Sequence, residues 1–224
     1  MIIAIVNKST QFPELTDPVI AEIAVAIQRQ LVEHFAASWE VMPPLVMTED
    51  DGKAFPIVIL DDADQAGALG YHTVDPLGRA WGRAFMGPIM VNGGTLKDGA
   101  ASLSVTLSHE ALEVAADPYA CFWSDATESR QVALEVCDPV EGDAYEIDGV
   151  SVSNFVTPRW FRGGPGPYDW MQKLEGPFAM TPGGYMIQRS SGDTGYIWGE
   201  QFPGWKRAMK SHAAARSTKR GATP

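Results

Sequence analysis

The sequence contains only two cysteines, Cys121 and Cys137, in 224 residues. Two cysteines are too few for a disulfide scaffold, so we expect free thiols in a reducing compartment, with a single bridge between them as the alternative. The sequence also lacks an apolar run of membrane-spanning length and a basic, apolar leader at its start. We therefore expect a soluble protein without a membrane partner, located in the cytoplasm or associated with a virus particle.

Basic side chains are scarce, with 17 Lys and Arg against 28 Asp and Glu. Six of these 17 lie in residues 206–224, which contain no acid, so the preceding chain is strongly acidic. An acidic body argues against a nucleic-acid-binding core, whose surface would be basic. We expect residues 206–224 to form a flexible, solvated tail, and contact with an anionic partner such as nucleic acid is the alternative for this segment only.

The signatures of two common enzyme classes are also missing. The glycines at 93–94 and 163–166 are not part of a Gly-Lys-Ser/Thr phosphate-binding loop between a strand and a helix. No serine lies in a G-x-S-x-G turn. These absences argue against a P-loop nucleotidase and against a serine hydrolase of the α/β type.

The pattern of apolar residues predicts an α+β fold, with a mixed sheet and two main helices followed by β-hairpins. We expect one domain over residues 1–205, β-rich from about 142 to 205, and the tail at 206–224. The expected elements in the first part are a buried strand at 2–6, a helix with Asp17 as N-cap and Pro18 as its first residue, and strands at 39–42 and 56–60. The glycine-rich segment that follows predicts extended stretches at 79–86 and 89–91.

A second helix is expected over residues 102–116, because Leu103, Leu107, Ala111 and Val114 recur at helical spacing. Asp117-Pro118 would end it. Further along, Asp148-Gly149 between two β-branched stretches predicts a hairpin, and a second hairpin is expected around residues 190–195.

This second helix carries the pattern H-E-x-x-E at residues 109–113. His109 and Glu113 lie one turn apart on one helix face, so a single cation could touch both side chains. Glu110 is rotated by about 100° from His109 and would flank a bound water as its general base. The spacing matches the H-E-x-x-H motif of zinc peptidases, with a carboxylate in place of the second histidine. A solvated helix face with surface carboxylates is the alternative interpretation.

A catalytic zinc usually has three protein ligands and a water, so a third ligand must come from elsewhere. The segment 134–141 follows the helix after a linker long enough to fold back, and we choose Asp138 from it. Four other residues are the alternatives: Glu135, Asp117, Cys137 and, further from the motif, His72. Asp138 could also serve simply as a turn former before Pro139.

The pattern S-H-E-x-x-E-x-x-x-D-P at 108–118, followed by E-x-x-D at 135–138, resembles the phosphate-induced protein family of plants and related fungal and bacterial zincin-like proteins. The resemblance covers roughly residues 104–140. It matches His109, Glu110, Glu113 and Asp117 to the first block, and Glu135 and Asp138 to the second. It implies a zincin-like scaffold, and the family itself implies no defined substrate.

The expected order of elements is that of a minimal zincin domain, in which an edge strand borders the cleft and can align an extended peptide. We expect residues 78–86 to be that edge strand. The glycine and the third histidine of the metzincin extension are missing, which excludes that subgroup.

Two functions follow from these residues. The first is a metal-dependent hydrolase, a metallopeptidase with a peptide or protein substrate, in which His109, Glu113 and Asp138 bind Zn²⁺ and Glu110 is the general base. One histidine with two carboxylates also suits Mn²⁺, Fe²⁺ or Ca²⁺. The second is a non-catalytic structural protein, such as a virion component, that uses a degenerate zincin-like scaffold for homo-oligomerisation or assembly.

Overall fold

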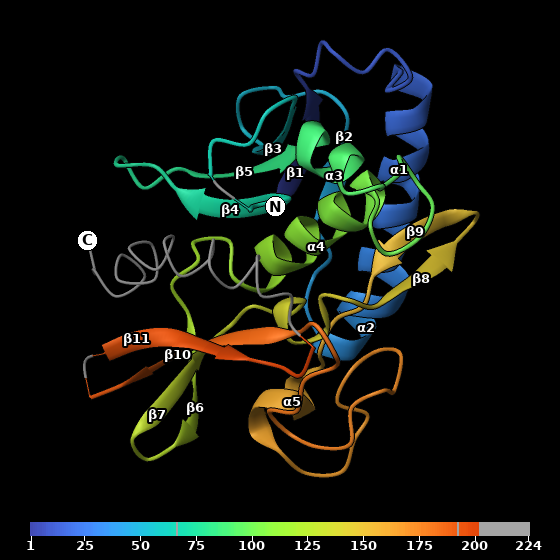
Figure 1. Ribbon diagram of the computed structural model, residues 1–224. Coiled ribbons are helices and arrows are strands. Elements are labelled where there is room, and N and C mark those ends of the chain that lie inside the picture. The colour runs from blue at the N-terminus through green and yellow to red at the C-terminus, as the bar shows by residue number, and fades with distance from the viewer. Residues whose placement is uncertain (66, 192, 202–224) are drawn as a thin grey trace.

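The computed structural model describes residues 1–65, 67–191 and 193–201. It has an α+β fold in which helices and mixed sheets are combined (Figure 1). Residues 206–224, the expected basic tail, lie outside the described residues. None of the helices in the described part of the chain has both the length and the apolar character that crossing a bilayer requires.

A five-stranded sheet occupies the first part of the chain. Its strand order is β2-β1-β3-β5-β4, and all neighbours are parallel except β4 and β5, which are antiparallel. The strands are β1 (Ile2–Asn7), β2 (Leu45–Met47), β3 (Phe55–Leu60), β4 (Gly70–Val74) and β5 (Ala80–Phe85). Strand β4 is therefore the edge of the sheet, and it lies beside the helix that carries the H-E-x-x-E motif.

The first helix, α1 (Asp17–Arg29), begins one residue earlier than predicted. Its N-cap is Thr16 and not Asp17, and Pro18 lies in the first turn as expected. Its buried stripe of isoleucines packs into the core. The helix continues through a π-helical segment, η1 (Gln30–Phe35), into the short helix α2 (Ala36–Trp39). The strand expected at 39–42 is therefore wrong. Trp39 instead stacks on Phe35 and donates a hydrogen bond to the Val156 carbonyl at 3.0 Å, which favours continuation of the helix.

Two further expectations about the extended segments need correction. Residues 89–91 belong to helix α3 (Met86–Val91) and not to a strand, because Pro88 lies in the first helical turn, where a missing N–H costs nothing. Residues 78–86 do not form the edge strand. Strand β5 lies between β3 and β4, and the turn at 75–78 folds the preceding strand back to form the edge.

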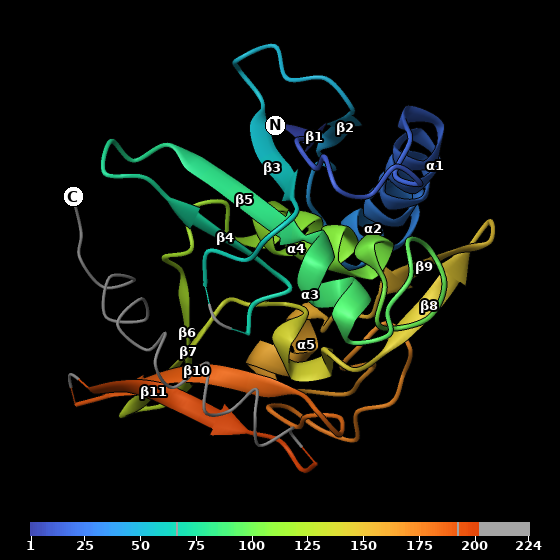
Figure 2. The ribbon, with the colours of Figure 1, turned by 45° about the horizontal axis from the view of Figure 1, so that its top comes forward.

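Helix α4 (Leu103–Ala116) confirms the second predicted helix. Its N-cap is Ser102, whose Oγ accepts a hydrogen bond from the Val105 N–H at 3.3 Å. The stripe of apolar residues predicted from the sequence is fully buried. Figure 2 shows α4 between the five-stranded sheet and strands β10 and β11. Its side chains are therefore enclosed from several directions, including the motif residues.

The remaining elements lie beyond α4. A four-stranded antiparallel sheet has the order β11-β10-β7-β6, and a separate hairpin pairs β8 with β9. The two hairpins predicted around 148–149 and 190–195 are confirmed. Most of residues 154–184 form loops around one short helix. The elements are β6 (Trp123–Thr127), β7 (Arg130–Ala133), the 3-10 helix η2 (Asp138–Val140), β8 (Ala144–Ile147), β9 (Val150–Ser153), α5 (Pro158–Arg162), β10 (Tyr185–Ser190) and β11 (Asp193–Trp198).

A buried polar network joins the first helix to α4 and β9. The Gln30 amide donates to the Ser153 carbonyl at 2.7 Å, and its Oε1 accepts from Ser108 Oγ at 2.6 Å. Ser108 Oγ in turn accepts from the Ser153 N–H at 3.0 Å. Gln30 and Ser108 are both 0% exposed, so these bonds are shielded from water. The network fixes helix α4 at the residue that precedes His109.

Candidate metal centre

Helix α4 and η2 bring together the three residues that the sequence predicts as ligands. His109 Nε2 lies 3.2 Å from Glu113 Oε1, one helical turn along α4. Asp138, the first residue of η2, places its Oδ1 3.4 Å from the same His109 nitrogen. One ligand atom from each of the three residues lies within 4.8 Å of the other two. The side chains of His109, Glu113 and Asp138 are 14%, 5% and 5% exposed, so the group is nearly enclosed.

The spacing of these atoms suits a shared cation as well as direct ion pairs. A charge-assisted N–H···O bond is typically about 2.7–2.9 Å long. Two ligands of a tetrahedral zinc with bonds of about 2.0–2.1 Å are separated by about 3.3–3.4 Å. The contacts of 3.2 and 3.4 Å at His109 Nε2 are close to the second value. One imidazole and two carboxylates are also ordinary ligands of divalent metals.

The other candidate ligands have different surroundings. Asp117 lies at the end of α4, where its Oδ2 accepts the Phe122 N–H at 2.7 Å and fixes the following turn. Cys137 contacts the site with its backbone, since its N–H donates to Glu113 Oε1 at 3.4 Å. Cys121 and Cys137 do not form a disulfide, which agrees with the expectation that no bridge joins them. Glu135 is buried, but among the described residues it belongs to neither of the groups with metal-ligand spacing.

Burial raises the pKa of the Cys137 thiol well above its usual value, and the nearby Glu113 charge adds to the effect. Without a cation the thiol therefore stays protonated. Its Sγ lies 3.8 Å from the His109 carbonyl oxygen, and among the described residues Cys137 belongs to neither group with metal-ligand spacing. Tyr185, at the start of β10, is also buried and lies close to Asp138. Its pKa is raised well above the usual value by burial first and by the Asp138 charge second. The site is therefore bordered by a neutral thiol and a neutral phenol.

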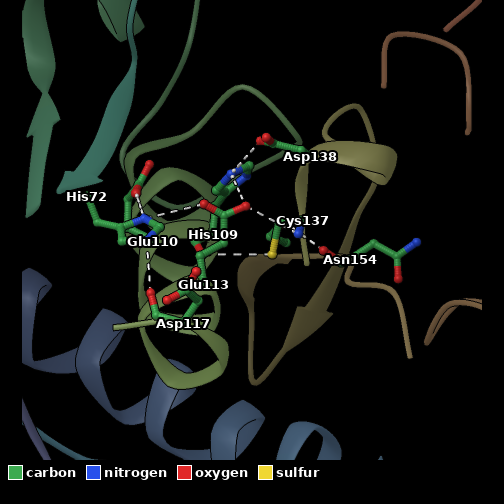
Figure 3. A network of polar contacts seen from close by, with 9 residues as sticks. His72, His109, Glu110, Glu113, Asp117, Cys137, Asp138 and Asn154 are labelled. Atoms are coloured by element: carbon green, nitrogen blue, oxygen red, sulfur yellow. Dashed lines mark hydrogen bonds and ion pairs between the residues drawn. The ribbon is translucent and has the colours of Figure 1, made fainter. Parts of the chain in front are cut away.

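His72 contributes to a second group that the sequence indicates only weakly. It lies on the edge strand β4 with its side chain facing α4, where its Nδ1 is 3.5 Å from both Glu110 Oε2 and Glu113 Oε2. Its other nitrogen, Nε2, is 3.2 Å from the Asp117 carbonyl oxygen. Figure 3 shows Glu113 between the two histidines. Recognising 70–74 as a strand over α4 would have indicated this inward-facing position.

The backbone of β4 approaches α4 closely at Gly70. A Cβ at this position would lie 2.9 Å from Glu110 Oε1 and 2.7 Å from Thr106 Cγ2. Only glycine leaves room for the strand and the Glu110 side chain together. The edge strand thus fixes Glu110 on one side through Gly70 and on the other through His72.

The two histidines and Glu113 strongly affect one another's protonation. Burial by itself lowers the pKa of His109, but Glu113 and Asp138 outweigh it and hold that pKa well above the usual value. Burial also lowers the pKa of His72, but Glu110 and Glu113 outweigh this effect and raise that pKa to about 9. Burial acts to raise the pKa of Glu113, but His109 and His72 lower it far below its usual range. Without a cation, the site holds two protonated histidines around an ionised carboxylate.

The position of Asp138 depends on a close contact between η2 and the start of β10. An added Cβ at Gly184 would lie 2.1 Å from the Pro139 carbonyl oxygen, inside the van der Waals limit. The same carbonyl accepts the Thr181 N–H at 3.0 Å. The packing of Gly184 against the backbone of Pro139 therefore determines where Asp138 lies, in addition to the contact of its side chain with His109.

We expect Gly184→Ala to displace η2 and to weaken zinc binding by about 10- to 100-fold, the range found when the support of a ligand is lost. Competition with a chromophoric chelator measures the affinity. Gly195→Ala on β11 is the matched control, because a Cβ there meets no atom within 4 Å of it and should leave the affinity unchanged. Equal affinities for both variants would show that this contact does not position the ligand.

Comparisons of the chain with protein-family models, with curated proteins and with solved structures found no match.

Proposed function

We propose that this protein is a metal-dependent hydrolase of the zincin type, with His109, Glu113 and Asp138 as the ligands of a divalent cation. The convergence of these three side chains from two separate elements, at 3.2 and 3.4 Å, is the observation that carries the proposal. The sheet supports it, because an antiparallel edge strand beside the motif helix is the arrangement expected of a zincin domain.

A divalent cation in this group would supply an acidified water and polarise a carbonyl oxygen. Zinc is our first choice, and the oxygen-rich set also suits Mn²⁺ or Fe²⁺. His109 and Glu113 hold their ligand atoms on one helix face. The Cys137 N–H donates a hydrogen bond to Glu113 Oε1 at 3.4 Å and so orients this carboxylate. We assign Glu110 as the general base that takes the proton from the attacking water onto its carboxylate.

A peptide is the substrate class that this geometry favours. Within the described chain, β4 pairs with β5 alone, so its second edge has backbone N–H and C=O groups open to a further strand. An extended peptide added there would run beside helix α4, because His72 of β4 and Glu110 of α4 are in contact. A peptide bond also contains the carbonyl group that a cation at this type of site would polarise for hydrolysis.

The burial of the ligands favours one second candidate, a non-catalytic protein in which a cation only stabilises the fold. Side-chain exposures of 14%, 5% and 5% resemble a closed structural site more than an open catalytic one. Such a protein would act in assembly, as a homo-oligomer or a component of a particle. The two candidates differ in oligomeric state and in turnover.

Elemental analysis by inductively coupled plasma mass spectrometry tests the metal centre. We expect about one zinc or other transition metal per chain, lost in the variant His109→Ala, Glu113→Ala. The control variant Glu33→Ala, His34→Ala removes the same residue types from η1 and should keep the metal. A protein that binds no metal even after reconstitution with zinc would contradict the hydrolase. A stable oligomer that shows no turnover even with its metal bound would support the assembly protein.

A further inference from the structure

His72 has no part in the proposed hydrolase, although its buried side chain lies directly beside Glu113. Its side chain is 1% exposed, and those of Glu110 and Glu113 are 5% exposed. One ligand atom from each of these three residues lies within 4.8 Å of the other two. The group therefore has the same compactness as the proposed zinc ligands, with Glu113 common to both.

The hydrogen bond at Nε2 determines what His72 presents to the carboxylates. The partner of Nε2 is the Asp117 carbonyl oxygen, which only accepts hydrogen bonds, so Nε2 carries the hydrogen. In the neutral imidazole the lone pair then lies on Nδ1. Nδ1 faces two carboxylate oxygens at 3.5 Å, so either a proton or a metal cation can occupy the position between the three atoms.

The distances leave room for a cation larger than a proton. Both contacts of 3.5 Å exceed the length of about 2.7–2.9 Å typical of a charge-assisted hydrogen bond. They are close to the separation of about 3.3–3.4 Å between ligands of one small divalent cation. Glu110 Oε2, moreover, is buried and makes no hydrogen bond to any of the residues described, so this oxygen faces His72 Nδ1 at 3.5 Å without a closer donor.

We propose that His72 Nδ1, Glu110 Oε2 and Glu113 Oε2 bind a second divalent cation, and that Glu113 bridges it to the cation held by His109 and Asp138. Glu113 is suited to this role because its two oxygens already face different histidines: Oε1 faces His109 and Oε2 faces His72. The second cation binds more weakly than the first, because it shares the charge of Glu113 with a cation that is already bound.

The second cation has a consequence for activity, which rests on the proposed function. Glu110 is the proposed general base, and a cation on its carboxylate competes with the proton that it must accept. Filling the second position therefore inhibits turnover. The enzyme should be most active with one equivalent of metal and lose activity as the second equivalent binds.

Zinc stoichiometry tests the inference without reference to activity. Metal-stripped protein is titrated with zinc, and the occupancy is read by native mass spectrometry. We expect the wild type to bind two zinc ions, the second at least tenfold more weakly, and His72→Gln and Glu110→Gln to bind one. Glu110→Gln keeps the shape of the side chain, so the test does not depend on tolerance of the His72 substitution. The control His34→Gln removes a histidine that stacks on Trp170 and should still bind two.

Two results would overturn the second site: saturation of the wild type at one zinc, or binding of two by both site variants. Saturation at one zinc would mean that His72 Nδ1 carries a proton and no metal. Two zinc ions in both variants would mean that the second zinc binds elsewhere. These results do not depend on whether the protein is a hydrolase. Two bound zinc ions without turnover under any condition would support the site and contradict the activity, whereas turnover at one equivalent with no second binding would do the opposite.

Discussion

Glu110→Gln is expected to lower the turnover number by about 100- to 10,000-fold, the usual contribution of a general base, while the first cation stays bound. The amide has the size of the carboxylate but cannot accept the proton of the attacking water. Glu110 is not among the ligand group of His109, Glu113 and Asp138, so the metal content should remain at about one per chain. Cleavage of a quenched fluorescent peptide library at one equivalent of zinc, together with elemental analysis, measures both quantities.

The control for this prediction is Glu146→Gln, which alters an exposed glutamate on β8 and should leave both turnover and metal content unchanged. Unchanged cleavage in Glu110→Gln would remove Glu110 from the mechanism. Loss of the first cation together with turnover would instead identify Glu110 as one of its ligands.

The metal-free protein is expected to lose stability as the pH rises from about 6.5 to about 9. The pKa of His72 is raised from 6.5 to about 9 in the folded protein, because Glu110 and Glu113 outweigh the opposing effect of burial. A raised folded-state pKa stabilises the fold fully below the unfolded-state value, and this contribution disappears as the pH passes through the folded-state value. For His72 alone the loss is on the order of 3 kcal/mol, and the raised pKa of His109 acts in the same direction.

Urea unfolding of metal-stripped protein at pH 6, 7.5 and 9 measures this dependence. His72→Gln should flatten the curve, whereas His34→Gln, which alters a histidine whose pKa is lowered by burial, should not. Saturating zinc should reverse the trend, since metal replaces protons on the histidines and its affinity grows with pH. A metal-free protein whose stability does not change between pH 6 and 9 would show that the histidines are not protonated in this way.

The elements that the sequence predicts well are those with local signals. The stripe of α4 with its Ser102 cap, the proline at the start of α1 and the Asp148-Gly149 turn each define an element from neighbouring residues. His109 and Glu113 are equally local, because helix geometry alone places them one turn apart.

The errors lie where long-range packing decides the structure. The sequence alone places Trp39 in a strand, because its contacts with Phe35 and the distant Val156 carbonyl are seen only in the structure. Residues 70–74 and 80–85 are both plausible edge strands, and only the register of β5 between its two neighbours distinguishes them. His72 illustrates the same limit at the site, because it meets Glu110 only when the sheet packs on the helix.

The Gln30 network limits how this chain can be divided. A fragment that lacked the first helix would leave the hydroxyl of Ser108 and the carbonyl of Ser153 without their amide partner in a buried position. Each buried polar group without a partner costs about 1–3 kcal/mol. The segment that carries the proposed ligands therefore cannot be transplanted as a minimal peptide. Any reduced or circularly permuted version must retain residues 17–39, although this helix contributes none of the proposed ligands.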